Sequence, residues 1–217
     1  MEASLAAGIN PEGRPRWNVG PQQTLFAVSA DGAGDRTLDT YTWGLLPSWA
    51  KDPSMGNKLF NARAETITEK PSFRSAFASR PCVIPVDGFY EWDHREGREK
   101  QPHYFTRRDG DPLLLAGITE VWRNPADPDA EPRRTCSVIT TTPNDDMEGL
   151  HERMPVVLTT HSSATWLDRE ASPSDRWALL GPAPRGTLEH WGVSSAVGNV
   201  RNDGAELIAP YELGTLF

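Results

Sequence analysis

Three polar residues, each in a short segment of its own, could do chemistry: Asn61 in NARAE, Glu91 in GFYEW and His151 in LHERMP. On a strand, the side chain of Asn61 would share a face with Arg63 and Glu65, since residues two apart point the same way. The functional interpretation is a polar face that lines a cleft. The alternative is a solvated strand face with an internal ion pair.

Glu91 is surrounded in the sequence by Phe89 and Trp92. An aromatic setting raises the pKa of a carboxyl group by desolvation, which suits a general acid or base. The alternative is a glutamate paired with a basic neighbour at a strand edge. His151 could move a proton near neutral pH. Its alternative is a histidine favoured by the dipole at the end of a helix over residues 142–151, capped by Thr142.

Two tryptophans, Trp43 and Trp49, flank the turn segment GLLPS. A tryptophan in a turn rich in Pro and Gly is harder to bury than one in a strand. We therefore expect Trp49 to form an exposed wedge or a surface on which bases stack, with a core position as the alternative for either indole.

Length and charge limit the class of protein. A chain of 217 residues is one domain, and its net charge of −8 argues against long-range attraction to duplex nucleic acid without excluding a local basic groove. No apolar run approaches the ~20 residues that span a membrane, so a cytoplasmic protein is expected. Cys82 and Cys136 lie in apolar runs, which favours buried thiols over a disulfide. No Cys/His spacing indicates a zinc site, and no cofactor is expected.

Frequent Pro and Gly, 19 and 18 residues, favour many short strands over long helices. The sequence predicts an α+β fold that is mainly antiparallel β, a curved sheet or partly closed barrel with short peripheral helices. The expected elements are strands at 24–30, 38–47, 135–141 and 154–159, hairpins at 82–92 and 103–122 about DG turns, a helix with a capping box at Thr66 and Glu69, and two short helices after residue 160.

Six motifs occur in one order: WNVGP, WGLLPSWA, NARAET, GFYEW, LHERMP and AVGNVRNDGAELI. Together they resemble the SRAP family, the abasic site processing proteins, over roughly residues 16 to 210. The resemblance implies a protein that binds single-stranded DNA, or its junction with a duplex, without membrane partners and as a monomer. It also implies covalent capture of abasic sites and cleavage of its own N-terminal peptide, a hydrolase activity.

The resemblance also implies a role for each site residue. A cysteine at position 2 condenses with the sugar aldehyde and closes a thiazolidine ring. Asn61 would place the N-terminal residue and the sugar, Glu91 would serve as acid and base, and His151 would donate protons to sugar oxygens. The phosphates would be bound by Arg63 and Arg153. The wedge that splays the DNA strand would consist of Pro21 and Trp49.

The chain departs from the family at position 2, where it has Glu2. Cys82 and Cys136 cannot replace an N-terminal cysteine, because a thiazolidine needs the amine and the thiol of one residue. Residues 1–16 are expected to be an atypical, truncated segment before a domain at 17–217, which would leave a sheet edge uncovered. The alternative is real divergence to a protein that binds single-stranded DNA without covalent capture. A third possibility is β-elimination through an imine at the Met1 amine.

Overall fold

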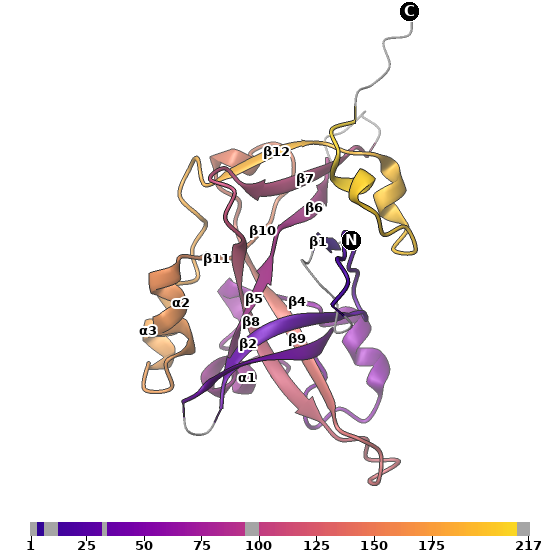
Figure 1. Cartoon of the computed structure of the whole chain (residues 1–217). Helices are drawn as coiled ribbons and strands as arrows, with labels where there is room; N and C mark the ends of the chain where they lie inside the picture. The colour runs from indigo at the N-terminus through magenta and orange to yellow at the C-terminus, as the bar shows by residue number, and fades with distance from the viewer. Residues whose placement is uncertain (1–3, 7–12, 32–33, 94–99, 212–217) are drawn as a thin grey trace, which may run out of the picture.

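The computed structural model describes residues 4–6, 13–31, 34–93 and 100–211 (Figure 1). The strands are β1 (Ser4–Ala6), β2 (Thr24–Ala30), β3 (Arg36–Trp43), β4 (Asn61–Arg63), β5 (Pro81–Val86), β6 (Gly88–Trp92), β7 (Pro102–Arg107), β8 (Leu113–Trp122), β9 (Arg133–Thr141), β10 (Met154–Pro155), β11 (Val157–Leu158) and β12 (Leu188–Gly192). The helices are α1 (Arg74–Ser79), α2 (Thr160–Leu167) and α3 (Pro173–Trp177), with 3₁₀ helices η1 (Pro53–Lys58), η2 (Ala64–Thr66), η3 (Asp145–Met147), η4 (Ser195–Gly198) and η5 (Ala205–Ile208).

The strands form two sheets. The smaller sheet has the order β1-β6-β7-β12, and the larger has the order β10-β9-β3-β2-β5-β8-β11 with β4 beside β9. Because β8 also pairs with β9, the strands β9, β3, β2, β5 and β8 form a closed circuit. Between the strands that the structure describes, all pairings are antiparallel except those of β9 with β3 and with β4. The predicted α+β fold, a partly closed and mainly antiparallel barrel with short helices around it, is confirmed.

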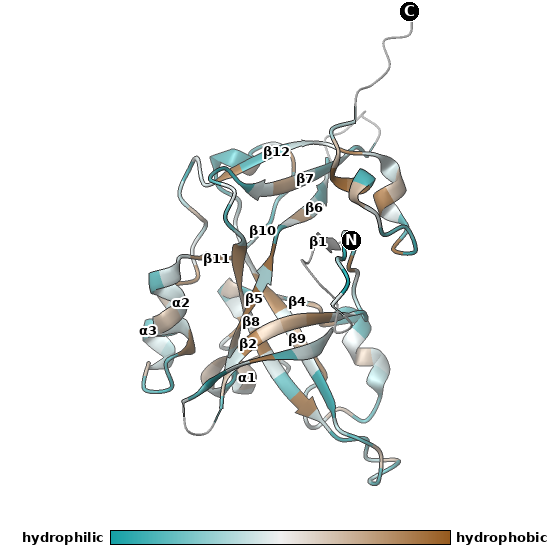
Figure 2. Ribbon diagram, in the orientation of Figure 1, coloured by the Kyte–Doolittle hydropathy of each residue, from teal (hydrophilic) through white to brown (hydrophobic). Residues whose placement is uncertain are grey.

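Alternate residues of the barrel strands pack into two different cores, so β5 is buried along most of its length. Cys82 and Ile84 belong to the core shared with the smaller sheet, whereas Val83 packs toward α1 and α2. The hydrophobic segments in Figure 2 follow this arrangement along the strands of the larger sheet. Cys82 and Cys136 are buried free thiols, as predicted.

Both predicted hairpins are wrong. β5 and β6 belong to different sheets, and so do β7 and β8, so each DG segment carries the chain from one sheet to the other. The hairpin that forms instead pairs β6 with β7. Gly88 opens β6 at a close approach: a Cβ there would lie 2.4 Å from the carbonyl oxygen of Phe105. Local turn signals are the same for a hairpin and for a crossing, which explains the error.

Several helix predictions and strand bounds also need correction. The helix α1 begins at Arg74 with no side-chain cap, and Thr66 lies in η2 rather than in a capping box. The segment 142–151 holds only the 3₁₀ helix η3, capped by Asn144 instead of Thr142. The strand expected at 154–159 is divided into β10 and β11, which pair with different strands, and β3 ends at Trp43. The two helices after residue 160 are confirmed as α2 and α3.

The sequence predicted an uncovered sheet edge, but in the smaller sheet β1 occupies the edge beside β6. Ser4, Leu5 and Ala6 pair with Tyr90, Phe89 and Gly88. The two strands are antiparallel, so β1 begins at the end of β6 that carries Glu91. Among the described residues, no helix has the length and apolar character needed to cross a membrane.

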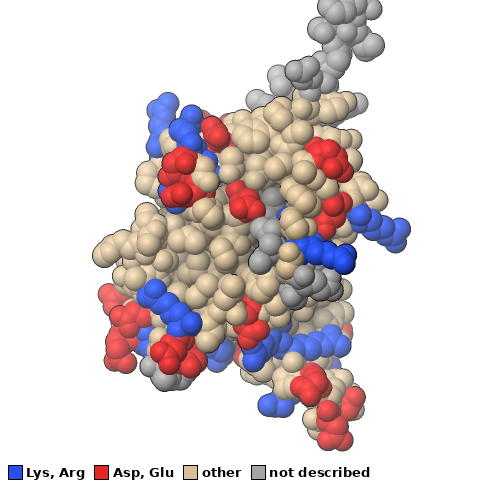
Figure 3. Space-filling view, viewed as in Figure 1, with Lys and Arg blue, Asp and Glu red and all other residues tan. Residues whose placement is uncertain are grey.

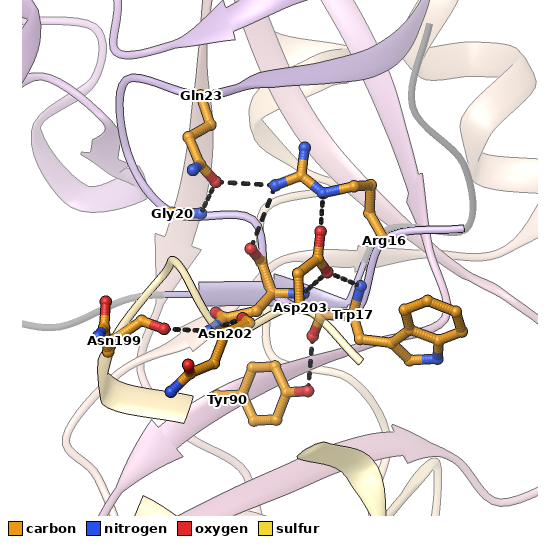
Figure 4. A network of polar contacts seen from close by, with 9 residues as sticks. Arg16, Trp17, Gly20, Gln23, Tyr90, Asn199, Asn202 and Asp203 are labelled. Atoms are coloured by element: carbon orange, nitrogen blue, oxygen red, sulfur yellow. Dashed lines mark hydrogen bonds and ion pairs between the residues drawn. The ribbon is translucent and has the colours of Figure 1, made fainter. Parts of the chain in front are cut away.

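A polar network joins the segment before β2 to the C-terminal loop and to the smaller sheet (Figure 4). The carboxylate of Asp203 pairs with Arg16 and accepts the backbone N–H groups of Trp17 at 2.7 Å and Asn18 at 3.1 Å. The buried side chain of Asn18 donates to the carbonyl oxygens of Val197, Asn199 and Asn202. The phenol of Tyr90 on β6 donates to the carbonyl oxygen of Trp17 at 2.7 Å. Three of the motifs that carry the family resemblance, WNVGP, GFYEW and AVGNVRNDGAELI, therefore hold the fold together.

Asp203→Asn is expected to lower the free energy of unfolding by about 1–3 kcal/mol, because an amide oxygen accepts these N–H groups more weakly and loses the pairing with Arg16. In a domain of this size the melting temperature should fall by roughly 3–10 °C. Urea denaturation with the control Asp129→Asn, which changes an exposed acid on the β8–β9 loop, provides the measurement. Equal midpoints for the two variants would show that the network is dispensable.

Candidate functional site

A small pocket of about 160 Å³ lies where the two sheets meet. Glu91 comes from β6 of the smaller sheet, and Asn61 and Arg63 come from β4 of the larger one. The remaining described lining residues are Lys58, Phe60, Thr140, His151 and Arg153. Five of the seven residues predicted from sequence thus line one pocket.

Asn61 reaches the pocket because β4 runs parallel to β9 and alternates in burial. Ala62 and Ala64 are buried against the core, which leaves Asn61 and Arg63 on the opposite face, as predicted. The Oδ1 atom of Asn61 is buried and has no hydrogen-bond partner among the described residues. A buried acceptor without a partner is costly, and this oxygen can accept a hydrogen bond from a donor that enters the pocket.

Glu91 is the acid of the site. Its side chain is 12% exposed, and burial raises the pKa of the carboxyl to about 8. The group is therefore mostly protonated at neutral pH and can donate a proton to a developing oxyanion or leaving hydroxyl. The raised pKa agrees with the expectation from its aromatic sequence neighbours.

His151 does not follow a helix, so the dipole interpretation is wrong. Its Nδ1 lies 3.1 Å from the backbone N–H nitrogen of Arg153 and 3.0 Å from the carbonyl oxygen of the same residue. The neutral ring can accept from the N–H, and the protonated ring can donate to the carbonyl, so the backbone supports both protonation states. Nε2 faces Glu91 Oε2 at 3.6 Å, longer than a direct hydrogen bond.

Glu65 pairs with Arg153 rather than within its own segment. The two guanidinium nitrogens of Arg153 lie 2.8 and 2.9 Å from the two carboxylate oxygens of Glu65, and one also donates to the carbonyl oxygen of Thr140 at 2.6 Å. Hydrogen bonding to Arg153 lowers the pKa of Glu65. Glu65 lies in η2, outside the strand, and its ion pair is with Arg153, which argues against the alternative of a strand face with an ion pair of its own. Much of the Arg153 charge is already neutralised.

Lys58 and Arg63 are the exposed cations of the pocket, and neither has an ion-pair partner among the described residues. Sequence reasoning missed Lys58, Phe60 and Thr140. Thr140 lies here because β4 pairs with β9 so that Arg63 is opposite Thr140, a long-range register that no local pattern encodes. Lys58 is the last residue of η1. The only feature of the sequence that could have placed it in the pocket was its position three residues before Asn61.

Pro21 and Trp49 are outside the set of residues that line the pocket. Trp49 is 54% exposed, so the core alternative is wrong for Trp49 and correct for Trp43, which is 1% exposed. Pro21 is half-buried in the turn that leads into β2. The exposed indole is suited to stacking on a base.

Charges of both signs are intermixed on the face shown in Figure 3. Acidic side chains gather on the projecting loop between β8 and β9, which contains Asp127 and Asp129. Among the described residues, no group of three His, Cys, Asp or Glu side chains could hold a metal ion.

Glu91→Gln is expected to stabilise the protein at alkaline pH. The folded state keeps a proton up to about pH 8 that the unfolded chain releases near its ordinary value of 4.5, so stability is lost as pH rises through this interval. The glutamine amide does not ionise, so the variant avoids this loss. The melting temperature of Glu91→Gln should exceed that of the parent by roughly 2–8 °C at pH 9, and the difference should shrink toward pH 5. A difference that does not change with pH would contradict a buried, protonated carboxyl.

Comparison with known proteins gives consistent matches. The sequence model of the family described as SOS response associated peptidase (SRAP) matches residues 2–200. The abasic site processing protein YoqW of Bacillus subtilis is 41% identical over 201 residues, 91% of this chain and 88% of YoqW. The abasic site processing protein YoaM of the same organism is 40% identical over 198 residues, 91% of this chain and 86% of YoaM.

The fold is also found in solved structures. A crystal structure of a protein from Bacteroides thetaiotaomicron aligns with a TM-score of 0.84 at 23% identity and covers 97% of this chain and 99% of that one. The family match spans most of the sequence, and the two relatives exceed 30% identity over nine-tenths of it. This chain therefore belongs to the SRAP family.

Proposed function

We propose that this protein binds single-stranded or junction DNA and acts on abasic sites. The single observation that carries the proposal is the convergence of Asn61, Glu91 and His151 on one small pocket. A volume of about 160 Å³ is below the ~300–1,000 Å³ of sites for larger ligands, which fits one sugar without its base. The relatives YoqW and YoaM are abasic site processing proteins.

The chemistry follows from the sugar. An abasic deoxyribose opens to an aldehyde, and an amine condenses with an aldehyde to form an imine with loss of water. A protonated Glu91 can supply the proton that the carbinolamine hydroxyl needs to leave, and His151 can give a proton to a sugar oxygen. The unpaired Oδ1 of Asn61 can accept from a sugar hydroxyl or from the attacking amine.

The DNA backbone would contact the arginines at the pocket. Arg63 is exposed and presents a guanidinium to a phosphate, the geometry that favours bidentate contacts. Arg153 would contribute less charge, because Glu65 already holds it. Pro21 and the exposed Trp49 would splay the strand next to the lesion, with the indole stacked on a neighbouring base.

Covalent capture as a thiazolidine, and release of an N-terminal peptide, require a form with cysteine at position 2. A second candidate function, for a form with Glu2 after Met1, is binding of abasic single-stranded DNA without a stable covalent link. Incubation with abasic single-stranded DNA followed by a denaturing gel separates the two. A heat-stable band from the Glu2 chain would overturn the second candidate. Equal affinity for single-stranded DNA with and without a tetrahydrofuran abasic analogue would overturn the proposed function itself.

The role of Glu91 can be measured in a Glu2→Cys variant. Adding Glu91→Gln should slow covalent capture by about a hundredfold or more, because the amide cannot donate the proton, while DNA affinity stays within about threefold. Glu148→Gln, which changes an exposed acid outside the pocket, is the matched control. A large loss of affinity instead would make Glu91 a structural residue.

Arg63→Ala should weaken binding to single-stranded DNA and reduce the slope of log K against log salt concentration by about 0.7, the contribution of one phosphate contact. Fluorescence anisotropy between low and moderate salt gives both quantities. Arg123→Ala removes an exposed arginine at the end of β8 and should leave the slope unchanged. An unchanged slope for Arg63→Ala would place the phosphates elsewhere.

A further inference from the structure

The pocket that Glu91 and His151 line is also lined by a residue with a primary amine. The chain has only four lysines, Lys51, Lys58, Lys70 and Lys100, and of these only Lys58 lines the pocket with Glu91 and His151. Its side chain is exposed and has no hydrogen-bond or ion-pair partner among the described residues. A lysine without a partner can turn its amine toward a ligand without breaking an existing contact.

The backbone that presents Lys58 is fixed on both sides. Asp52 caps η1 by accepting the N–H of Ser54 at 2.8 Å, and the N–H of Leu59 closes the helix on Gly56 at 3.2 Å. The carbonyl oxygen of Leu59 then accepts the N–H of Leu45 at 3.1 Å.

Phe60 continues this anchor. Its carbonyl oxygen accepts the indole N–H of Trp43 at 2.8 Å and the N–H of Val138 at 3.0 Å. Gly44 and Gly56 pack so closely that a Cβ on Gly44 would lie 2.6 Å from the carbonyl oxygen of Gly56. These contacts fix the backbone on both sides of Lys58 at the pocket, and its exposed four-carbon side chain can reach toward a ligand.

We propose that Lys58 is a second nucleophile of this site, which forms an imine with the C1′ aldehyde of an abasic deoxyribose. This inference rests on the proposed function. After Lys58 has given its extra proton to water, the neutral Nζ attacks the carbonyl carbon, and one of its two remaining protons passes to the oxygen to give a carbinolamine. A proton from Glu91 then releases the hydroxyl as water, leaving a protonated C1′=Nζ imine and the Glu91 carboxylate. No oxidant, metal or further reactant is needed, and hydrolysis by water reverses the step.

The competing interpretation of Lys58 is a phosphate contact, and one substitution separates the two. Lys58→Arg keeps the positive charge but removes the nucleophilic amine, because a guanidinium stays protonated. A phosphate contact would survive this change, whereas an imine would not. Lys51→Arg, seven residues earlier in the same connection and outside the pocket lining, is the matched control.

The test is reductive trapping. Abasic single-stranded DNA is incubated with the full chain and borohydride, which adds hydride to the imine carbon and fixes a stable C1′–Nζ amine. Peptide mass mapping should locate the adduct on Lys58. Trapping should fall at least about tenfold in Lys58→Arg, with the Lys51→Arg control at the parent level. The yield of trapped adduct should also fall in Glu91→Gln. Adducts formed at random on surface lysines would not depend on Glu91.

Binding to the tetrahydrofuran analogue, which has no aldehyde, is measured in parallel. An adduct that maps to the N-terminal amine, or that persists in Lys58→Arg, overturns the inference and leaves the proposed function in place. Preferential binding of the analogue without any trapped adduct likewise overturns the role of Lys58 and leaves the proposed function in place. No adduct together with no preference for abasic DNA removes both.

Discussion

The docking of the two sheets against each other is the constraint on which the site depends. Glu91 belongs to the smaller sheet, whereas Asn61 and Arg63 belong to the larger one, so no single sheet contains the site. The network around Asp203 ties the segment leading into β2 to the C-terminal loop, and Tyr90 ties β6 to the same segment. The residue after Tyr90 is Glu91. The hydrogen bond of Tyr90 to Trp17, which helps to hold the two sheets together, therefore also helps to hold Glu91 in position.

This arrangement links architecture to chemistry through burial. Burial removes water from the carboxyl of Glu91 and raises its pKa to about 8. If the sheets separated, the carboxyl would be hydrated and would lose its proton at neutral pH. Asn61 carries a similar cost, since its buried Oδ1 lacks a hydrogen-bond partner among the residues that the structure describes. The large apolar cores on both sides of the barrel offset these costs.

The sequence predicted individual strands well and their partners poorly. Alternation identified β2 and β9, and the face that Asn61 shares with Arg63, because these signals are local. The two hairpins failed because a DG step reads the same whether the chain turns back or crosses to another sheet. The contact of Arg153 with Glu65 and the place of Thr140 depend on the parallel register of β4 on β9, which involves residues far apart in the chain. Lys58 carried no pattern of its own.

The charges at the pocket explain how a protein with net charge −8 could hold a polyanion and still do proton chemistry. Glu65 neutralises much of the charge of Arg153, so among the described lining residues the unpaired positive charges are those of Arg63 and Lys58, which are exposed. Attraction for phosphate is then short-ranged and screened by salt, which suits recognition of a splayed strand more than capture of any duplex. The interior of the pocket stays near neutral, because Glu91 is protonated there. A neutral acid beside an amine is the pairing that imine formation requires, and a densely cationic pocket would instead favour the ionised carboxylate and remove the proton donor.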